Sequence, residues 1–246
     1  MRRLRGLLIA DPGIILATIF FGIISVIVSL FETTGAMQVR VARAWGKALL
    51  AVSGVRVHVE GLEQIDPTAS YVFAANHQSY MDTPVALANI PAQFRFLAKR
   101  GLFQIPLLGT HLSRAGHIPV PREDPRAAVK TLQLAAEKIQ KLKISLLIFP
   151  EGGRSPEGKL APFKEGAAYI AIRAGVPVVP LVLMGTRNSL PYGGGVVQSA
   201  AVTLRVLKPI ETAGLTLKDR SKLTTEVHAL IGDELGRESH LILQPQ

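Results

Sequence analysis

The strongest constraint on the fold is a series of short apolar runs, each followed along the chain by a stretch with helical periodicity. The runs cover residues 71–75, 94–98, 144–149 and 176–184. The third run is uninterrupted, as is typical of a central parallel strand with helices on both faces. Strands that alternate with helices predict an α/β domain, with a mostly parallel or mixed central sheet flanked by helices.

Other segments complete this architecture. Residues 55–60 alternate between apolar and polar side chains, which predicts a half-exposed strand. Pro177 and Pro180 lie in the run 176–184, and because proline cannot donate to a sheet they favour an edge or irregular position for this strand. Helical patterns cover residues 82–89, 124–143, 164–173 and 216–236.

The composition indicates an anionic, lipid-like partner. The 246 residues carry a net charge of +10, which favours anionic lipid, nucleic acid or a phosphorylated substrate. The mean hydropathy of +0.29 favours lipid among these. Aromatic residues make up only 6% of the chain, so no nucleic-acid partner is expected. The absence of cysteine excludes disulfides, thiolate metal sites and a cysteine nucleophile, and since no histidine has metal-ligand spacing, no metal is expected.

An uncharged stretch of 18 residues, 14–31, lies near the N-terminus. As a helix it would be roughly 27 Å long, which is close to the thickness of a membrane's hydrocarbon core. Asp11 and Pro12 predict the start of this helix. A signal peptide is the other interpretation, but its apolar region is normally shorter. Basic residues are balanced on the two sides, so a single span and a monotopic arrangement both stay open.

A second N-terminal helix is predicted over residues 37–52. Its apolar face consists of Met37, Val41, Trp45, Ala48 and Val52, and nearly opposite lie Arg40, Arg43 and Lys47. This pattern is typical of a helix that lies in a membrane interface, with Trp45 at the headgroup level. The alternative is an ordinary surface helix packed on the domain. We therefore predict membrane-associated helices over residues 1–52 and a globular domain over residues 53–246.

The chemistry is expected in residues 76–82, Asn-His-Gln-Ser-Tyr-Met-Asp, directly after the first apolar run. A histidine can act as a general base near neutral pH, and a carboxylate can fix its tautomer and stabilise the imidazolium. Residues five apart lie roughly 140° apart around a helix, so His77 and Asp82 meet only if the chain bends into the following helix. Pro84 favours such a bend, because proline is tolerated in a first turn. The alternative is a capped helix with an incidental histidine.

Cations lie near the ends of other predicted strands or in loops: Lys99, Arg122 and Arg154. They can donate to a phosphate, although for each one alone a solvated surface residue is the alternative. Glu151 follows the run 144–149, and Gly152 after it lets the backbone approach a ligand closely. Parallel sheets gather chemistry at the carboxyl ends of their strands, where His77, Lys99 and Glu151 are all expected. A Gly-x-Ser-x-Gly elbow, a Walker A loop and a Rossmann glycine fingerprint are absent from the sequence.

Four blocks in this order resemble the glycerolipid acyltransferases, the group that contains 1-acylglycerol-3-phosphate acyltransferase. The blocks are residues 76–82 (His-x4-Asp), 99–122, 149–155 (usually Phe-Pro-Glu-Gly-Thr-Arg-Ser) and 176–181. The resemblance covers about residues 55–210. Gly153 stands where the family usually has threonine, and Pro121 stands where it more often has aspartate.

The resemblance implies direct acyl transfer by an acyltransferase domain, residues 53–246. His77 would be the general base for the sn-2 hydroxyl of 1-acylglycerol 3-phosphate, and Asp82 would orient it. The hydroxyl would attack the thioester of acyl-CoA or acyl-carrier protein and make phosphatidate, without a covalent acyl-enzyme. No cofactor is implied beyond this acyl co-substrate.

The resemblance also assigns the substrate contacts. The acceptor's phosphate would be held by Lys99, Arg122 and Arg154, its glycerol end by Glu151, and the phosphate site would be shaped by Gly152. The expected partners are a lysophospholipid, an acyl thioester, acyl-carrier protein and an anionic membrane surface. The expected location is the cytoplasmic face of the cell membrane.

Two alternatives stay open. A sister acyltransferase would use another acceptor, such as glycerol 3-phosphate, another lysophospholipid or an amino-acid lipid. A non-catalytic protein would use the same basic surface to bind anionic membranes, but it would need neither His77 nor Asp82.

Overall fold

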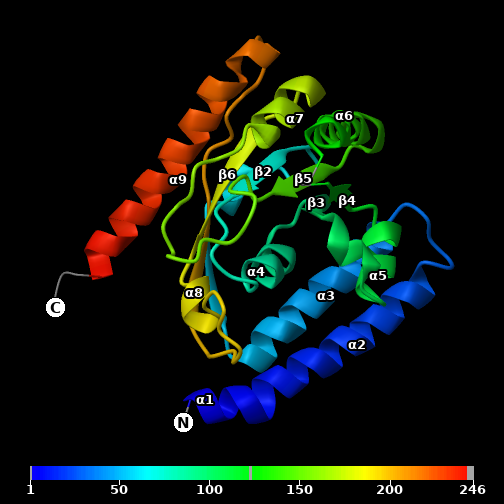
Figure 1. Ribbon diagram of the computed structural model, residues 1–246, viewed down its shortest axis with the longest axis vertical. Coiled ribbons are helices and arrows are strands. Elements are labelled where there is room, and N and C mark those ends of the chain that lie inside the picture. The colour runs from blue at the N-terminus through cyan, green and yellow to red at the C-terminus, as the bar shows by residue number, and fades with distance from the viewer. Residues whose placement is uncertain (1, 122–123, 243–246) are drawn as a thin grey trace.

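The computed structural model describes residues 2–121 and 124–242, and its central sheet is covered by helices on both faces (Figure 1). In this described part the strands are β1 (Arg56–Glu60), β2 (Val72–Ala75), β3 (Phe94–Lys99), β4 (Ile118–Val120), β5 (Ser145–Ile148), β6 (Val178–Met184) and β7 (Ala201–Val206). They lie in the order β1-β7-β6-β2-β5-β3-β4. Neighbours run parallel except for β6 and β7, which are antiparallel. The predicted α/β class with a mixed central sheet is confirmed.

The helices form a layer on each face of the sheet. One layer contains α3 (Ala36–Ser53) and α4 (Asp82–Asn89), and α2 (Asp11–Val28) packs against α3. The opposite layer contains α6 (Pro125–Leu142), α7 (Gly166–Ala174) and α9 (Arg220–Ile242). The short α-helices are α1 (Arg2–Arg5), α5 (Leu108–Arg114) and α8 (Thr186–Ser189), and the π-helical segment η1 (Gly6–Ala10) joins α1 to α2.

The core lies on both faces of the central strands. In β2, Phe73 and Ala75 join the cluster beneath α3 and α4, whereas Val72 and Ala74 join the cluster beneath α6, α7 and α9. This alternation follows from the two-residue period of a strand. Every residue of β2 and of β5 is buried, and β5 lies between β2 and β3, which confirms the prediction of a central strand for the run 144–149.

The prolines favoured an edge or irregular position for β6, and of these two the edge position is wrong. β6 lies between β7 and β2, and all seven of its residues are buried. Val178 exchanges two backbone hydrogen bonds with Ile210 on the β7 side, and because backbone groups alternate along a strand, the Pro180 nitrogen faces that side too. The antiparallel ladder with β7 covers only Leu181 to Met184, so Pro180 lies just outside it. The parallel pairing with β2 loses no donor.

The α3 helix packs on the domain, which is the alternative stated above for residues 37–52. It contacts α2 on one side and α4 on another. The Trp45 indole donates to Thr18 Oγ1 of α2 over 3.1 Å, and so Trp45 lies between two helices. The Arg43 guanidinium donates to the carbonyls of residues 90–92 at the end of α4. Of the predicted basic face, Arg40 and Lys47 are exposed.

The N-terminal helical segment presents apolar side chains to the surroundings. By length and composition, Arg3–Val28 is the one helix in the described chain that could cross a membrane, and little of it is buried. Its exposed large apolar side chains are Leu4, Leu7, Leu8, Ile9, Ile15, Leu16, Ile19, Phe20, Ile23 and Ile27. An apolar surface of this kind suggests membrane association.

This segment is also attached to the domain near both of its ends. The Arg5 guanidinium donates to the carbonyls of Val52 and Ser53 at the end of α3. Near the other end, Ser25 Oγ lies 2.7 Å from His111 Nδ1 of α5. The helix therefore lies along the domain (Figure 1). The predicted domain boundary after residue 52 stays a prediction.

Candidate active site

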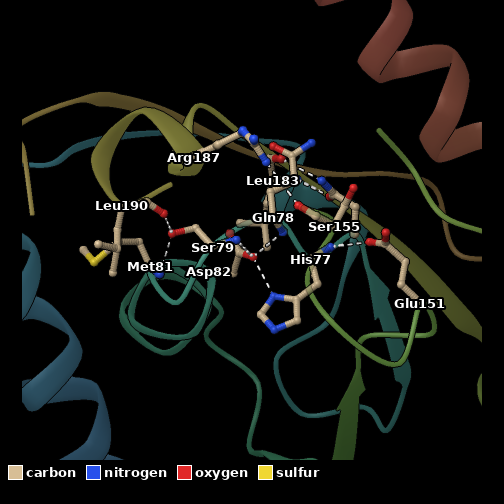
Figure 2. Close-up of polar contacts among 11 residues, drawn as sticks. His77, Gln78, Ser79, Met81, Asp82, Glu151, Ser155, Leu183, Arg187 and Leu190 are labelled. Atoms are coloured by element: carbon tan, nitrogen blue, oxygen red, sulfur yellow. Dashed lines mark hydrogen bonds and ion pairs between the residues drawn. The ribbon is translucent and has the colours of Figure 1, made fainter. Parts of the chain in front are cut away.

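Three neighbouring strands bring the predicted site residues to one edge of the sheet. β2, β5 and β3 are parallel neighbours, so their carboxyl ends meet. His77 follows β2, and Glu151 follows β5. The His77 backbone N–H donates to Glu151 Oε1 over 2.6 Å (Figure 2). Lys99 ends β3 at the same edge, where it is exposed.

His77 and Asp82 contact each other as predicted. The distance from His77 Nδ1 to Asp82 Oδ2 is 2.7 Å. Asp82 is the first residue of α4 and is fully buried, and Pro84 lies in the same first turn. Asp82 Oδ2 also accepts the backbone N–H groups of Gln78 and Ser79, each over 2.8 Å. The bend between the strand and the helix is therefore built on the carboxylate that orients the ring.

These contacts fix the tautomer of the His77 ring. Because Asp82 Oδ2 already accepts two backbone N–H groups, it acts as an acceptor toward the ring too, and so Nδ1 carries the hydrogen. Nε2 is then the nitrogen that can take up a proton. The ring stacks on Phe149, with 4.0 Å between centroids and 17° between planes. This stacking and the bond to Asp82 hold the His77 ring in one orientation.

The Glu151 carboxylate joins two loops at the site. Its Oε1 accepts from the His77 N–H, and its Oε2 accepts from the Ala161 N–H over 3.0 Å. Burial raises the pKa of Glu151, while the hydrogen bonds from Ala161 and His77 act in the opposite direction. We predicted that Glu151 holds the glycerol end of the acceptor. The structure gives it a backbone-bridging role that spacing did not indicate, and its substrate role stays a prediction.

Other polar side chains hold the same loops (Figure 2). Ser79 Oγ donates to the Leu190 carbonyl over 2.8 Å and accepts from the Met81 N–H. The Ser155 N–H donates to the His77 carbonyl over 3.1 Å. Arg187 donates to the Ser155 carbonyl over 3.1 Å. The loops after β2, β5 and β6 therefore support one another around His77.

The predicted cations are placed differently from one another. The guanidinium carbon of Arg154 lies 3.5 Å from the ring centroid of Tyr80 and 4.8 Å from that of Tyr192. Lys99 is exposed at the end of β3. Arg122 lies outside the described residues.

Gly152 has a close neighbour that sequence reasoning missed. Its φ of +75° is a conformation that L residues rarely adopt, and a Cβ there would lie 2.8 Å from Lys164 Nζ. Lys164 thus brings a cation to the loop between Glu151 and Arg154. Its position follows from the fold of the loop and not from any spacing in the sequence. In the described chain, no group of three or more His, Asp and Glu residues could hold a metal ion.

An apolar groove of about 320 Å³ begins at Thr83, the residue after Asp82. Its lining includes side chains from α2, α3, α4 and the segment around α5, among them Phe21, Trp45, Leu87, Leu108 and Leu112. Thr83, the neighbour of Asp82, also lines the groove, as does Phe96. Phe96 stacks on Phe149 with 6.3 Å between centroids, and so the groove is connected to the His77 ring through two aromatic side chains.

The family model for acyltransferases matches residues 56–184, which is more than half of the chain. The chain belongs to the acyltransferase family. One relative is a chloroplastic 1-acyl-sn-glycerol-3-phosphate acyltransferase of Brassica napus. It is 39% identical to this chain over 157 residues, which cover 63% of this chain and 45% of the relative. A 1-acyl-sn-glycerol-3-phosphate acyltransferase of Saccharomyces cerevisiae is 32% identical over 204 residues, or 82% of this chain and 67% of the relative.

Solved structures of the family include a match over the whole chain. The crystal structure of the 1-acyl-sn-glycerophosphate acyltransferase PlsC from Thermotoga maritima is similar with a TM-score of 0.81 and 27% identity, and the match covers 100% of both chains. The chain spans less than half the length of the Brassica napus relative. The matched residues 56–184 include His77, Asp82, Glu151 and Arg154.

Proposed function

We propose that this chain transfers a fatty acyl group from an acyl thioester to the sn-2 hydroxyl of 1-acylglycerol 3-phosphate and so makes phosphatidate. Family membership supports the reaction class, and the acceptor is supported by the similarity to 1-acyl-sn-glycerol-3-phosphate acyltransferases. The observation that carries the proposal is the contact of 2.7 Å between His77 Nδ1 and Asp82 Oδ2 beside an apolar groove. A protein that only binds lipid has no use for such a pair.

In the proposed reaction, His77 takes up one proton from the acceptor and then gives it to the leaving group. Nε2 takes the proton of the acceptor hydroxyl while the hydroxyl oxygen attacks the thioester carbonyl carbon. Asp82 stabilises the imidazolium that forms and keeps Nδ1 as the donor toward itself. The tetrahedral intermediate then expels the thiolate, which takes up the proton from the imidazolium. The products are the ester and the free thiol, and no acyl-enzyme forms.

The substrates are assigned by the chemistry of the surfaces around His77. The apolar groove suits the acyl chain of the donor, because burial of methylene groups stabilises binding by about 0.8 kcal/mol each. The cations Arg154, Lys99 and Arg122 suit the acceptor's phosphate. Lys164 is a further candidate, since its ammonium lies beside Gly152. Donors from coenzyme A and from acyl-carrier protein both fit this arrangement.

The membrane is the proposed source of the lysolipid. The outer face of the N-terminal helix is apolar, and the helix lies along the domain with attachments at Arg5 and Ser25. We propose a monotopic arrangement on the cytoplasmic face, where acyl-CoA and acyl-carrier protein are available. The domain would then rest on the bilayer with the groove close to the lipid surface.

The test is an acyl-transfer assay on purified protein in lipid or detergent. The acceptor is 1-acylglycerol 3-phosphate, and labelled acyl-CoA and acyl-carrier protein are supplied separately. His77→Ala is expected to lower kcat by at least 100-fold, in the range of general-base catalysis. The matched control is His58→Ala, because the His58 side chain on β1 is 73% exposed and lies outside the site.

Each result decides a separate point. Phosphatidate from the wild type and from His58→Ala, but not from His77→Ala, supports both the reaction and the base. Equal activity of His77→Ala would overturn the mechanism. Activity only with glycerol 3-phosphate or another lysophospholipid would replace the acceptor. Liposome binding without transfer to any acceptor would leave the non-catalytic alternative.

A further inference from the structure

The Arg154 guanidinium lies over the faces of two aromatic rings. The guanidinium carbon lies 3.5 Å from the centroid of Tyr80 and 4.8 Å from that of Tyr192. Both tyrosines are exposed, with relative accessibilities of 63% for Tyr80 and 47% for Tyr192. Stacking of a guanidinium on aromatic faces is favourable because the ring quadrupole attracts the cation.

Protein oxygens within the described chain do not take up the N–H donors of Arg154. By contrast, protein oxygens accept from the guanidiniums of Arg5, Arg43, Arg95, Arg187, Arg205, Arg220 and Arg237. No described residue accepts a hydrogen bond from Arg154. Its position is set by ring faces, which leave the in-plane N–H donors available. Such donors match the oxygens of a phosphate in a bidentate arrangement.

Tyr192 comes from a loop that is closed at its base and tied to the motif. The Gln198 N–H donates to the Ser189 carbonyl over 2.8 Å, and Ser189 Oγ donates back to the Gln198 carbonyl over 2.7 Å. The Leu190 carbonyl accepts from Ser79 Oγ. Gly193 has a φ of +72°, which lets the loop turn sharply just after Tyr192. The loop therefore presents Tyr192 from a fixed base.

We propose that Tyr80 and Tyr192 are positioning residues that hold Arg154 between two rings, so that its N–H edge binds the phosphate of the acyl acceptor. This inference rests on the function proposed above. Tyr80 reaches Arg154 from the His77–Asp82 loop, and Tyr192 reaches it from the loop after α8. An arginine that is already ordered loses less side-chain entropy when it binds its ligand. Loss of a ring therefore weakens acceptor binding and leaves the chemical step nearly unchanged.

The test compares leucine and phenylalanine at each tyrosine. Tyr80→Leu and Tyr192→Leu are each expected to raise KM for 1-acylglycerol 3-phosphate about two- to fivefold, which corresponds to one exposed cation–π contact. The larger effect is expected at Tyr80, where the ring is closer. Tyr80→Phe and Tyr192→Phe keep the ring and should keep the wild-type KM, and kcat should stay within twofold in all four variants.

A double-mutant cycle shows whether the rings act through Arg154. In an Arg154→Ala background, either leucine substitution should leave KM unchanged, because the cation is already absent. An equal rise in KM with and without Arg154 would overturn the proposal, as would a wild-type KM in both leucine variants. If KM rises as much in the phenylalanine variants as in the leucine variants, the effect comes from the hydroxyl groups. That result would also overturn the proposal.

Binding without the thioester separates this inference from the proposed function. The dissociation constant of 1-acylglycerol 3-phosphate is measured by calorimetry in detergent for the same variants. If the wild type binds this lipid but does not acylate it, the proposed function fails, and the ratios of dissociation constants still decide the role of the rings. If the wild type neither binds nor acylates it, both proposals are overturned.

Discussion

The side-chain amide of Asn76 forms two hydrogen bonds with the backbone of Leu183. Its Nδ2 donates to the Leu183 carbonyl over 2.9 Å, and its Oδ1 accepts from the Leu183 N–H over 2.7 Å. Asn76 is fully buried and lies directly before His77. The amide thus continues the pairing of β2 with β6 by one step beyond the end of β2, and it fixes the point at which the loop with His77 begins.

Asn76→Ala is expected to lower the free energy of unfolding by about 2–4 kcal/mol, because a buried N–H and a buried C=O would both lose their partner. Denaturant unfolding in detergent measures this loss. The matched control is Asn89→Ala, whose amide donates only to the Val85 carbonyl within the same helix. The control substitution should lower the free energy of unfolding by about 1 kcal/mol or less. An equal decrease in both variants would contradict the role given to Asn76.

Asp82→Asn is expected to lower kcat by about 100-fold or more while leaving the fold intact. The amide has nearly the shape of the carboxylate, but it carries no negative charge to stabilise the imidazolium. Steady-state kinetics with saturating acceptor measure the effect. Asp124→Asn is a suitable control, because Asp124 caps α6 and asparagine is an equally good cap. Wild-type kcat in Asp82→Asn would remove Asp82 from the mechanism.

Two adjacent glycines are expected to respond differently to a side chain. Gly152→Ala should lower the free energy of unfolding by about 1–2 kcal/mol, since an L residue is strained at its φ of +75°. It should also reduce kcat/KM, because its methyl group would displace Lys164. Gly153→Thr should be tolerated in both respects, since a Cβ at Gly153 meets no heavy atom within 4 Å. Thermal unfolding and acyl-transfer assays compare the two variants. Equal decreases in stability and in kcat/KM would contradict the geometry.

The stability of the protein is expected to fall as the pH falls from about 6.5 toward 4. Burial, with a smaller contribution from Arg95, lowers the pKa of His111 from 6.5 to about 4. Burial also lowers the pKa of His117. In this range the unfolded chain binds more protons than the folded chain, so the free energy of unfolding increases with pH.

Replacement of His111 tests this dependence. His111→Gln keeps a polar partner for Ser25 but cannot titrate, so its unfolding free energy should vary less between pH 6.5 and 4 than that of the wild type. Chemical denaturation at a series of pH values measures the slope. His58→Gln, at an exposed position, should keep the wild-type slope. If His111→Gln also keeps the wild-type slope, His111 does not contribute to the dependence of stability on pH.

The sequence was sufficient to predict that His77, Asp82 and Glu151 meet at one edge of the sheet, but not how their loops are supported. Continuous apolar runs identified β2 and β5, and the rule that parallel strands share an edge placed His77 near Glu151. The bond from His77 N–H to Glu151, and that from Asn76 to Leu183, join residues more than 70 positions apart. Only the packed chain brings such groups together, since no local pattern encodes the partner.

The same limit explains where the structure differs from the predictions made from the sequence. Pro180 excluded one donor from β6, but the sequence did not tell which side of the strand that donor would face. The apolar face of α3 fitted a membrane and a second helix equally well, and the structure places α2 against it. Tyr80 was visible within the His77–Asp82 loop, yet its contact with Arg154 depends on how the loop after β5 folds.

The packing of α3 has a practical consequence for handling this protein. Val39, Ala42, Leu49 and Leu50 of α3 are buried, and Ala42 and Leu50 share a hydrophobic cluster with Phe73 of β2. A chain that starts at residue 53 would expose the part of this cluster that α3 covers and would aggregate. A water-soluble form is better obtained by replacing outward apolar side chains of the first helix, such as Leu8, Leu16 and Phe20, with polar ones.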